Sequence, residues 1–298
     1  MSKRKNIISI LGAASDLGAN RAGARMGPDA IRIAGLHRKL KQLDYQITDS
    51  GNIPVPLRNF GSEGAYNYLI EIADINNTIF EHCYQALQGK KIPLTLGGDH
   101  SIAMATVAAS AKHFDNLGVI WIDTHADMNN PRSSPSKNIH GMPLSTLLHD
   151  GFDELVKLVP NKLNPQNIAL IGLRDIDKKE KTLLSDSKMH YYTMRDIDEL
   201  GIQGIFKDLS NKMLNRLDHL HVSFDLDVMD PIHAPGVSTP VNGGLSTREA
   251  HLLLELLYET KKVKACDFVE LNPMRDLKGK SAKLMVELIT SLFGSTII

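Results

Sequence analysis

Short apolar segments rich in isoleucine and valine recur along the chain, and segments with helical spacing of apolar residues lie between them. Apolar runs of this length, bounded by polar or turn-forming residues, predict buried β-strands. We expect eight strands, near residues 6–11, 45–49, 92–96, 118–122, 167–171, 189–193, 220–224 and 264–270. We expect helices at residues 28–42, 64–89, 101–113, 246–259 and 280–293.

The alternation of strands and helices predicts the fold class. Parallel strands are joined by crossover helices, so this order favours an α/β protein with a mostly parallel sheet covered on both faces. No repeat, low-complexity tract or linker interrupts the pattern, which predicts a single domain over residues 1–298. The longest stretches without a predicted element, 123–141 and 225–245, follow strands directly. Ligands of such sheets bind at the carboxyl ends of the strands.

Composition and charge exclude several classes of protein. The 34 basic residues are balanced by 34 acidic ones, so there is no overall basic excess of the kind that nucleic acid or an anionic membrane attracts. No apolar run approaches the roughly 20 residues of a membrane span. Cys83 and Cys266 lie far apart and form neither a zinc motif nor a disulfide framework. The basic residues 3–5 before Ile7 imitate a secretory signal, but Gly12 interrupts the short apolar run, and we expect a cytoplasmic protein.

Acidic and imidazole side chains gather where two of the predicted strands end. Asp123, His125 and Asp127 alternate directly after the strand at 118–122, and Asp225 and Asp227 end the strand at 220–224. Alternate residues of an extended chain point to the same side. We therefore expect the side chains of each group to converge.

A third group, Gly97-Gly-Asp-His100, ends the strand at 92–96. Its glycines permit the close backbone approach that a crowded site needs. Asp99 by itself would most often be a turn former or a helix N-cap. Together, however, the three groups place five carboxylates and two imidazoles at the ends of buried strands, and such an arrangement is prohibitively costly unless cations neutralise it. The sequence therefore predicts a metal site.

The donor set indicates which metal binds there. The set contains no thiolate and has more oxygen than nitrogen donors, which favours Mn²⁺, with Mg²⁺, Co²⁺ and Fe²⁺ as alternatives, over a structural zinc ion. The number of ligands exceeds what one ion uses, whereas two ions about 3.5–4 Å apart can share carboxylates. The chemistry that follows is hydrolysis by a metal-activated water.

These motifs carry a family resemblance. The blocks GGDHS at 97–101, DTHADMN at 123–129, NIHGMP around His140 and SFDLDVMDP at 223–231 resemble the ureohydrolase family, which includes arginases and agmatinases. The resemblance runs from residues 25–28 to residues 269–273. It implies a three-layer α/β/α fold around an eight-stranded sheet, a centre of two Mn²⁺ per subunit, and a homo-oligomer, either a trimer or a hexamer.

The resemblance also implies roles for the residues that match the family motifs. The metal ligands are expected to be His100, Asp123, His125, Asp127, Asp225 and Asp227. The first aspartate of each block bridges the ions in the family, and a hydroxide held between the ions attacks the substrate guanidinium.

Three catalytic residues follow from the same resemblance. Glu270 resembles the glutamate that forms a salt bridge with the guanidinium group. Asp127 resembles the group that takes the hydroxide proton and passes it to the leaving amine. His140 resembles a proton-shuttle histidine, a task that suits a group whose ordinary pKa is near neutrality.

The far end of the substrate is where the members of this family differ. Asn129, Ser136 and Asn138 stand where arginases bind the α-carboxylate of the substrate, and neutral hydrogen-bond donors suit a carboxylate. Asp177 and Glu180 stand where arginases hold the α-amino group. Agmatine lacks the carboxylate, so this loop favours an arginase that cleaves L-arginine to L-ornithine and urea.

Several matches are less specific. Thr239 aligns with a family threonine near the guanidinium, and Arg248 resembles an arginine at subunit contacts, although a solvated arginine explains it equally well. Arg132 and Lys137 add cations to the substrate loop, and we interpret both as solvated. The other histidines are interpreted as surface or packing residues.

Alternative functions remain at this point. The first is an agmatinase or another guanidino hydrolase, which would share the metal blocks. A binuclear phosphoesterase would need cationic or backbone-amide clamps for phosphate, whereas the loop here is mainly amide and hydroxyl. A non-catalytic metal protein would need neither His140 nor Glu270.

Overall fold

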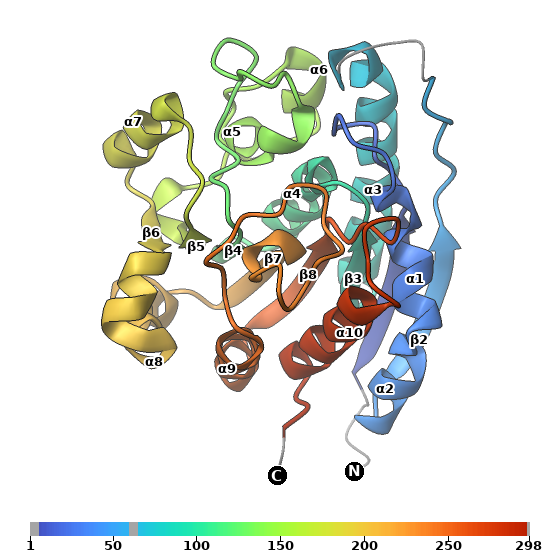
Figure 1. The fold of residues 1–298 in the computed structure, drawn as a ribbon, viewed down its shortest axis with the longest axis vertical. Coiled ribbons are helices and arrows are strands. Elements are labelled where there is room, and N and C mark those ends of the chain that lie inside the picture. The colour runs from blue at the N-terminus through green and yellow to red at the C-terminus, as the bar shows by residue number, and fades with distance from the viewer. Residues whose placement is uncertain (1–5, 60–64, 297–298) are drawn as a thin grey trace.

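A single sheet of parallel strands forms the centre of the molecule (Figure 1). The computed structural model describes residues 6–59 and 65–296. Within them the sheet has eight strands in the order β2-β1-β3-β8-β7-β4-β5-β6, and every neighbouring pair is parallel. The strands are β1 (Ile7–Ala13), β2 (Gln46–Asn52), β3 (Ile92–Gly97), β4 (Leu117–Ile122), β5 (Ile168–Leu173), β6 (His190–Thr193), β7 (His219–Asp225) and β8 (Val263–Val269). All eight predicted strands are confirmed.

The helices connect these strands in the order expected of crossovers. They are α1 (Gly27–Ile33), α2 (Leu36–Gln42), α3 (Leu69–Gln88), α4 (Ala103–His113), α5 (Pro143–Leu147), α6 (Asp153–Val156), α7 (Lys178–Asp186), α8 (Met194–Lys212), α9 (Thr247–Glu259) and α10 (Lys280–Leu292). None of the helices within the described residues is long and apolar enough to span a membrane.

Two helix predictions need correction. The single helix expected at 28–42 is two helices, because Gly35 adopts a left-handed conformation with φ 101° and ends the first of them. The helix expected at 64–89 begins later, at Leu69, after a 3₁₀ turn over Ala65–Tyr68, and residue 64 lies outside the described residues. The helix α8 was not predicted; its backbone is interrupted at Gly201, where φ is 67°.

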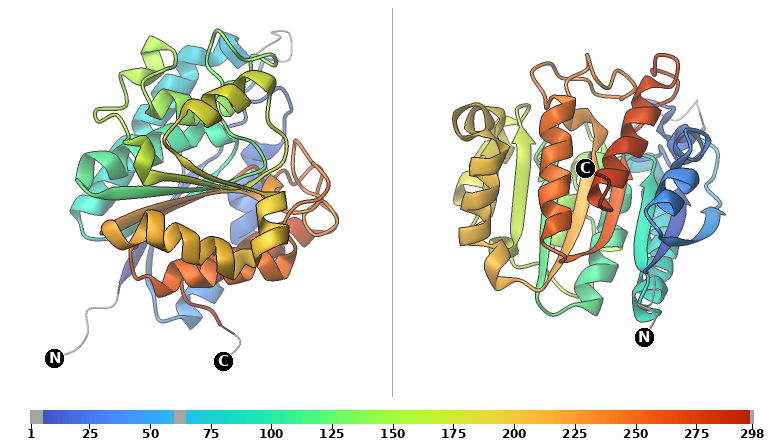
Figure 2. Two further views of the ribbon diagram at one scale, coloured as in Figure 1. Left: turned by 90° about the vertical axis from the view of Figure 1, so that its left-hand side faces the viewer. Right: turned by 90° about the horizontal axis from the view of Figure 1, so that it is seen from below.

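The sheet divides the molecule into three layers, as Figure 2 shows from two further directions. Strand β4 illustrates the division, since all six of its residues are buried. Ile120 and Ile122 belong to the hydrophobic cluster that includes residues of α1, α2, α8, α9 and α10. Val119 and Trp121 point the other way, into the cluster that includes α3 and α4. The predicted three-layer α/β/α fold around an eight-stranded sheet is confirmed.

The order of the strands determines where a site can form. β3 and β4 follow one another along the chain, but β8 and β7 lie between them in the sheet. β7 and β4 are neighbours, yet the chain runs from β7 to β8 on one side and from β4 to β5 on the other, so it leaves the carboxyl ends of β7 and β4 in opposite directions. Open parallel sheets bind their ligands at such switch points.

Candidate metal centre and active site

The four central strands each deliver a predicted site residue at the carboxyl end. Asp123 follows β4 directly, Asp225 is the last residue of β7, and Glu270 follows β8. His100 begins the 3₁₀ helix η3 (His100–Ile102), which follows β3. Parallel pairing alone brings these ends to one edge of the sheet, so residues up to 170 positions apart in sequence lie together.

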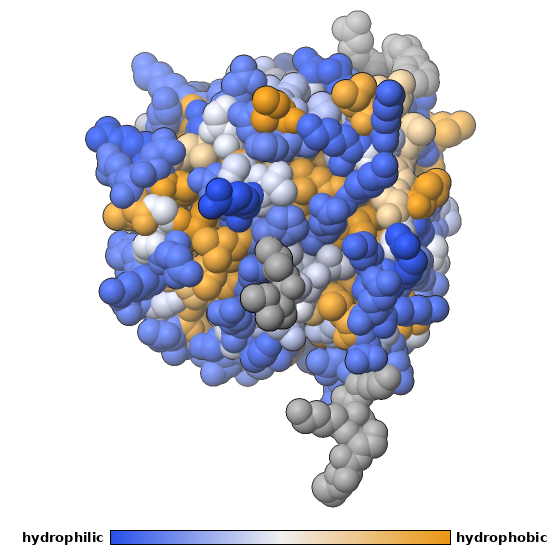
Figure 3. All heavy atoms as spheres, turned by 60° about the horizontal axis from the view of Figure 1, so that its bottom comes forward, coloured by the Kyte–Doolittle hydropathy of each residue, from blue (hydrophilic) through white to orange (hydrophobic). Residues whose placement is uncertain are grey.

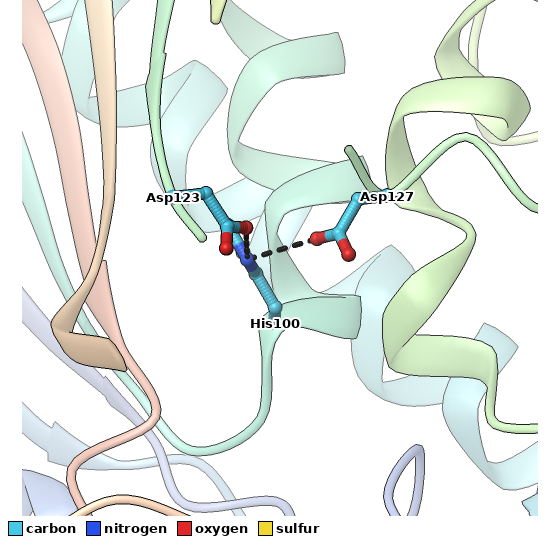
Figure 4. Close-up of side chains that lie close together, drawn as sticks. All are labelled: His100, Asp123 and Asp127. Atoms are coloured by element: carbon cyan, nitrogen blue, oxygen red, sulfur yellow. Dashed lines mark ion pairs between the residues drawn. The ribbon is translucent and has the colours of Figure 1, made fainter. Parts of the chain in front are cut away.

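One cluster surrounds the ring nitrogen Nδ1 of His100. This atom lies 3.1 Å from Asp123 Oδ2, 3.0 Å from Asp127 Oδ2 and 3.2 Å from Asp225 Oδ2. Figure 4 shows the side chains of Asp123 and Asp127 pointing toward the ring from opposite sides. One nitrogen cannot satisfy three carboxylates by hydrogen bonds, so the arrangement calls for a cation.

A second cluster shares Asp123. Its other oxygen, Oδ1, lies 3.5 Å from Nδ1 of His125, and Oδ2 of Asp227 lies 3.3 Å from the same nitrogen. The ligand-type atoms of these three residues all lie within 4.8 Å of one another, as do those of His100, Asp123 and Asp127. Two neighbouring groups that share one aspartate are the arrangement expected of two adjacent ions.

The geometry fits divalent metal ions in two respects. Ligands bound at about 2.1 Å and at right angles around an ion are about 3.0 Å apart, close to the spacing around His100. Four buried ligand-type atoms of this site also make no hydrogen bond to the described residues: His100 Nδ1, Asp127 Oδ2, Asp227 Oδ1 and Glu270 Oε2. Unpartnered buried polar atoms are rare in folded proteins, and their concentration here indicates that they bind something other than protein.

Electrostatics supports the same conclusion. Burial, reinforced by the charge of Asp123, raises the pKa of Asp127 to about 6. Burial and the neighbouring Asp227 raise the pKa of Asp225 well above its ordinary value. Burial alone would lower the pKa of His100, but the surrounding carboxylates raise it far above 6.5. Protons therefore compete with any cation for this site.

The expected alternation of residues 123–127 is only partly right. The side chains of Asp123, His125 and Asp127 do converge, but the backbone is not extended. The His125 N–H donates to Asp123 Oδ1 at 2.7 Å, which closes a local turn, and Asp127 has a positive φ of 51°. A left-handed aspartate is strained, and such strain is concentrated at functional sites.

The ring of His100 is held by groups that the sequence did not single out. It stacks on Trp121 with ring centroids 4.3 Å apart, and its Nε2 lies 2.9 Å from Ser223 Oγ. The Ser223 hydroxyl donates to Asp267 Oδ1 at 2.6 Å, so Ser223 can only accept from His100. In its neutral form His100 therefore carries its proton on Nε2, which leaves the lone pair of Nδ1 free for a metal ion.

The carboxylate of Asp267 is the centre of a fully buried network. Its Oδ2 accepts from Thr106 Oγ1 at 2.6 Å and lies 2.8 Å from His221 Nε2. His221 Nδ1 in turn lies 2.8 Å from Ser110 Oγ. His221, interpreted from sequence as a surface or packing residue, is thus a buried hydrogen-bonding residue; its alternate spacing with Ser223 and Asp225 was the available signal.

His140 and Glu270 form a second functional pair beside the cluster. Nδ1 of His140 lies 2.8 Å from Glu270 Oε1, which also accepts from the His100 N–H at 2.9 Å. Burial alone would lower the pKa of His140, but Glu270 raises it to about 9. Glu270 has a positive φ of 64°, and burial would raise its pKa, but His140 holds that pKa below its usual value.

A cavity of about 210 Å³ opens above these groups. It is lined by His100, His125, Asp127, Asn129, Ser136, Asn138, His140, Gly141, Asp175, Asp177, Glu180, Asp225, Asp227 and Thr239. Apart from Asp123 and Glu270, every predicted site residue is in this lining. The structure therefore brings the predicted ligands, catalytic residues and substrate residues to one place, and it adds Gly141 and Asp175, which the sequence did not single out.

Several predicted substrate residues also bind one another. Asn129 Nδ2 donates to Asp177 Oδ2 at 2.9 Å, and Glu180 accepts from the backbone N–H groups of Asp177 at 3.1 Å and Met128 at 3.0 Å. Burial raises the pKa of Glu180 to about 7. These bonds fix the start of α7 against the loop after β4.

The remaining residues of this loop differ in their exposure and in their hydrogen bonds. Asn138 Oδ1 is buried and makes no hydrogen bond among the described residues, whereas Ser136 is exposed. Arg132 forms an ion pair with Asp150 at 2.6 Å and is 79% exposed, so it is tied away from the cavity. Lys137 is exposed, as expected of a solvated cation.

An α/β protein whose central strands end in buried carboxylates and imidazoles beside a polar cavity is typical of metal-dependent hydrolases. Comparison with known proteins narrows this class. The model of the Arginase family matches residues 6–294. An arginase of Staphylococcus aureus (strain MSSA476) is 44% identical over 304 residues and covers 100% of both chains. An arginase of Bacillus subtilis (strain 168) is 43% identical, over 98% of this chain and 99% of its own.

A solved structure agrees with these relatives. The native arginase of Bacillus caldovelox superposes with a TM-score of 0.94 at 41% identity, over 98% of this chain and 100% of that one. The chain belongs to the arginase family. The family expected from the sequence motifs is thereby confirmed.

Proposed function

We propose that this protein hydrolyses the guanidinium group of L-arginine to give L-ornithine and urea. The observation that carries the proposal is one cavity lined by most of the ligand cluster, by His140, whose Nδ1 contacts Glu270, and by the loop residues expected to bind an amino acid. The full-length relatives described above are named arginases, which supports the same substrate.

The cofactor that we propose is a pair of Mn²⁺ ions. The residues that would hold them are His100, Asp123, His125, Asp127, Asp225 and Asp227. When bound, divalent ions supply Lewis acidity and lower the pKa of a coordinated water. The oxygen-rich donor set without thiolate favours Mn²⁺ over zinc.

The protein's own residues divide the remaining work. Glu270 Oε2 is buried behind His140 and has no hydrogen-bond partner in the described part of the chain, so we assign its anion to the planar guanidinium cation. Asp127, whose pKa is raised to about 6, is suited to accept a proton and to release it to the leaving amine. His140 keeps Nδ1 on Glu270, which leaves Nε2 to exchange a proton with the bulk.

Recognition of the α-carboxylate selects L-arginine over agmatine. Ser136 and Asn138 line the cavity, and their hydroxyl and amide groups can donate to a carboxylate. Asp177 and Glu180 lie on the same cavity and supply anions for the α-amino group. Thr239 donates to Asp227 Oδ2 at 2.8 Å, so we assign it to the support of that ligand as well as to the guanidinium side.

The test is urea release by the Mn²⁺-loaded protein with L-arginine and agmatine in parallel, together with a metal-stripped control. We expect urea from L-arginine only, and Asn138→Ala should raise KM for L-arginine about tenfold, the effect of one lost charge-assisted hydrogen bond. Urea release from agmatine would contradict the assignment of L-arginine as the substrate. If neither compound released urea, the proposed function would be wrong.

The assembly, the domain organisation and the compartment are also proposals. We infer a homo-oligomer of a single-domain subunit, a trimer or a hexamer. Arg248 lines a groove of about 880 Å³ between α8, α9 and α10, which supports a contact there. Both cysteines are free and buried, which fits the reducing cytoplasm. Light scattering of the native protein and of Arg248→Ala tests the assembly.

A further inference from the structure

Asp99 is fully buried, and the proposed reaction gives it no role. Its two carboxylate oxygens accept from two separate parts of the backbone. The Ser101 N–H donates to Oδ1 at 3.0 Å, which makes Asp99 the N-cap of η3, the role that sequence alone favours. The Gly18 N–H, 81 positions earlier in the chain, donates to Oδ2 at 2.9 Å.

Capping alone does not explain an aspartate at this position. One acceptor oxygen is enough for an N-cap, and serine supplies it without burying a charge. Asp99 has no exposed surface, and burying a carboxylate is costlier than burying a hydroxyl. A carboxylate supplies a second acceptor oxygen, and in Asp99 this oxygen, Oδ2, accepts from the Gly18 N–H.

Gly18 connects Asp99 to the proposed proton-shuttle residue. Its N–H points to Asp99, and its carbonyl oxygen accepts from the backbone N–H of His140 at 3.0 Å. A Cβ atom at this position would lie 2.6 Å from Asp99 Oδ1 and 2.9 Å from Ser101 Oγ. The close approach therefore requires glycine.

These bonds close a ring through the active site. His140 Nδ1 lies 2.8 Å from Glu270 Oε1, and the same oxygen accepts from the N–H of His100, the residue next to Asp99. The ring thus joins the loop after β1, the start of η3, the turn at His140 and the end of β8. Within this ring, the single residue Gly18 is hydrogen-bonded to both Asp99 and His140.

We propose that Asp99 is a positioning residue for the proton-transfer step: through Gly18 it fixes the backbone of His140 and so the place of the imidazole beside Glu270. The proposal rests on the function proposed above, in which His140 carries the proton. Under this proposal Asp99 differs from an ordinary N-cap. An ordinary N-cap would contribute to the stability of the fold and would not position one catalytic residue.

The variant Asp99→Ser separates the two roles. Its hydroxyl can still cap η3, but it is too short to reach Gly18. We expect kcat for L-arginine to fall about 10- to 100-fold, the effect of misplacing a reacting group by about 1 Å. KM and the bound metal per subunit should stay within about twofold, since the loop and the ligands are untouched. A loss of metal would overturn the proposal, because Asp99 would then act through His100.

A double-mutant cycle with His140→Ala decides whether the effect passes through His140. In the His140→Ala background, Asp99→Ser should lower kcat by less than about threefold, because the residue that it positions is gone. If the two losses multiply instead, Asp99 acts independently of His140 and the proposal fails. Failure of the proposed function looks different, because the wild-type protein would then release no urea.

A second variant keeps the test independent of how Asp99→Ser folds. Gly18→Ala keeps the Asp99 carboxyl group but places a Cβ 2.6 Å from Asp99 Oδ1, so the loop after β1 and the carboxylate must move apart. It should show the same loss of kcat and the same non-additivity with His140→Ala. The matched control is Asn164→Ser, since Asn164 caps another 3₁₀ helix by accepting from Gln166 N–H at 3.1 Å. Its kcat should equal that of the wild type; an equal loss in this control would overturn the proposal.

Discussion

All strands have their carboxyl ends on one side of the sheet, here called the carboxyl edge, and their amino ends on the other, the amino edge. Charged side chains are arranged differently at these two edges, although the chain as a whole carries no net charge. At the carboxyl edge, carboxylates crowd around His100 and Asp127 adopts a left-handed backbone. At the amino edge, Lys262 Nζ donates to the carbonyls of Leu214 at 2.8 Å and Leu217 at 2.7 Å. Figure 3, turned to bring this lower side forward, shows mainly hydrophilic residues with separate apolar areas between them.

Helix direction accounts for part of this difference. The crossover helices run opposite to the strands, so their partly positive N-termini lie toward the carboxylate cluster and their partly negative C-termini lie toward the lysines. Lys262 binds one carbonyl of the 3₁₀ helix η6 (Leu214–Arg216), that of Leu214, and the carbonyl of Leu217, which follows this helix. The carboxylate oxygens around His100 instead lie close to one another in a buried site, which costs stability unless a cation binds there.

The largest effect expected from this comparison lies on β7, which carries an aspartate near each end. Asp225→Asn at the carboxyl edge should lower Mn²⁺ affinity more than 100-fold and abolish urea release, because loss of even a partner of a ligand costs about 10- to 100-fold. Asp218 precedes β7 at the amino edge and accepts from Asn116 Nδ2 at 2.8 Å. Asp218→Asn should leave both quantities unchanged; isothermal titration and urea assays compare them, and equal effects would refute the contrast.

Removal of the metal should lower the stability of the fold by an amount that depends on pH. Asp127 has a raised pKa of about 6, so between about pH 4 and pH 6 the folded protein holds a proton that the unfolded chain has released. The free energy of unfolding therefore falls as pH rises through this range. The raised pKa values of His100 and His125 stabilise the metal-free fold below about pH 6.5, and that contribution is lost as pH rises. A bound metal ion would replace these protons.

The thermal midpoint gained from Mn²⁺ should therefore be larger at pH 8 than at pH 5. One ion at about 100 times its Kd contributes about 2.7 kcal/mol, which corresponds to roughly 4 °C for a chain of this size. Differential scanning calorimetry with Mn²⁺ and with a chelator, repeated across this pH range, measures the gain. A gain that stays constant with pH would contradict the proton competition.

The support beneath His100 offers a smaller test. Ser223→Ala removes the acceptor that holds the His100 proton on Nε2, and we expect Mn²⁺ affinity to fall about 10- to 100-fold. The control is Ser110→Ala in the same network, which contacts His221 and not a ligand. It should cost stability but leave the affinity near that of the wild type. Titration of both variants with Mn²⁺ decides, and equal losses would refute the tautomer argument.

The sequence predicts those features that depend on local pattern. Buried apolar runs located all eight strands, and strand-end spacing located Asp123 and Asp225. The network around Asp267 was not predictable in this way, because it depends on the register that pairs Ser223 with Asp267 across β7 and β8, 44 residues apart. Helix α8 was missed because Gly201 interrupts its periodicity.

The smallest expected effect lies at the amino edge and completes the comparison. Lys262→Met keeps the apolar stem of this half-buried side chain but removes both bonds to the carbonyls of Leu214 and Leu217. Because two acceptors lose a charged donor, the free energy of unfolding should fall by about 1–2 kcal/mol, as urea denaturation would measure. The control Lys264→Met removes one bond, to the carbonyl of Lys261, from an exposed site and should cost less than about 0.5 kcal/mol. Neither variant should change kcat or Mn²⁺ affinity, since neither touches the carboxyl edge. A loss of activity in Lys262→Met at full stability would mean that the two edges are coupled.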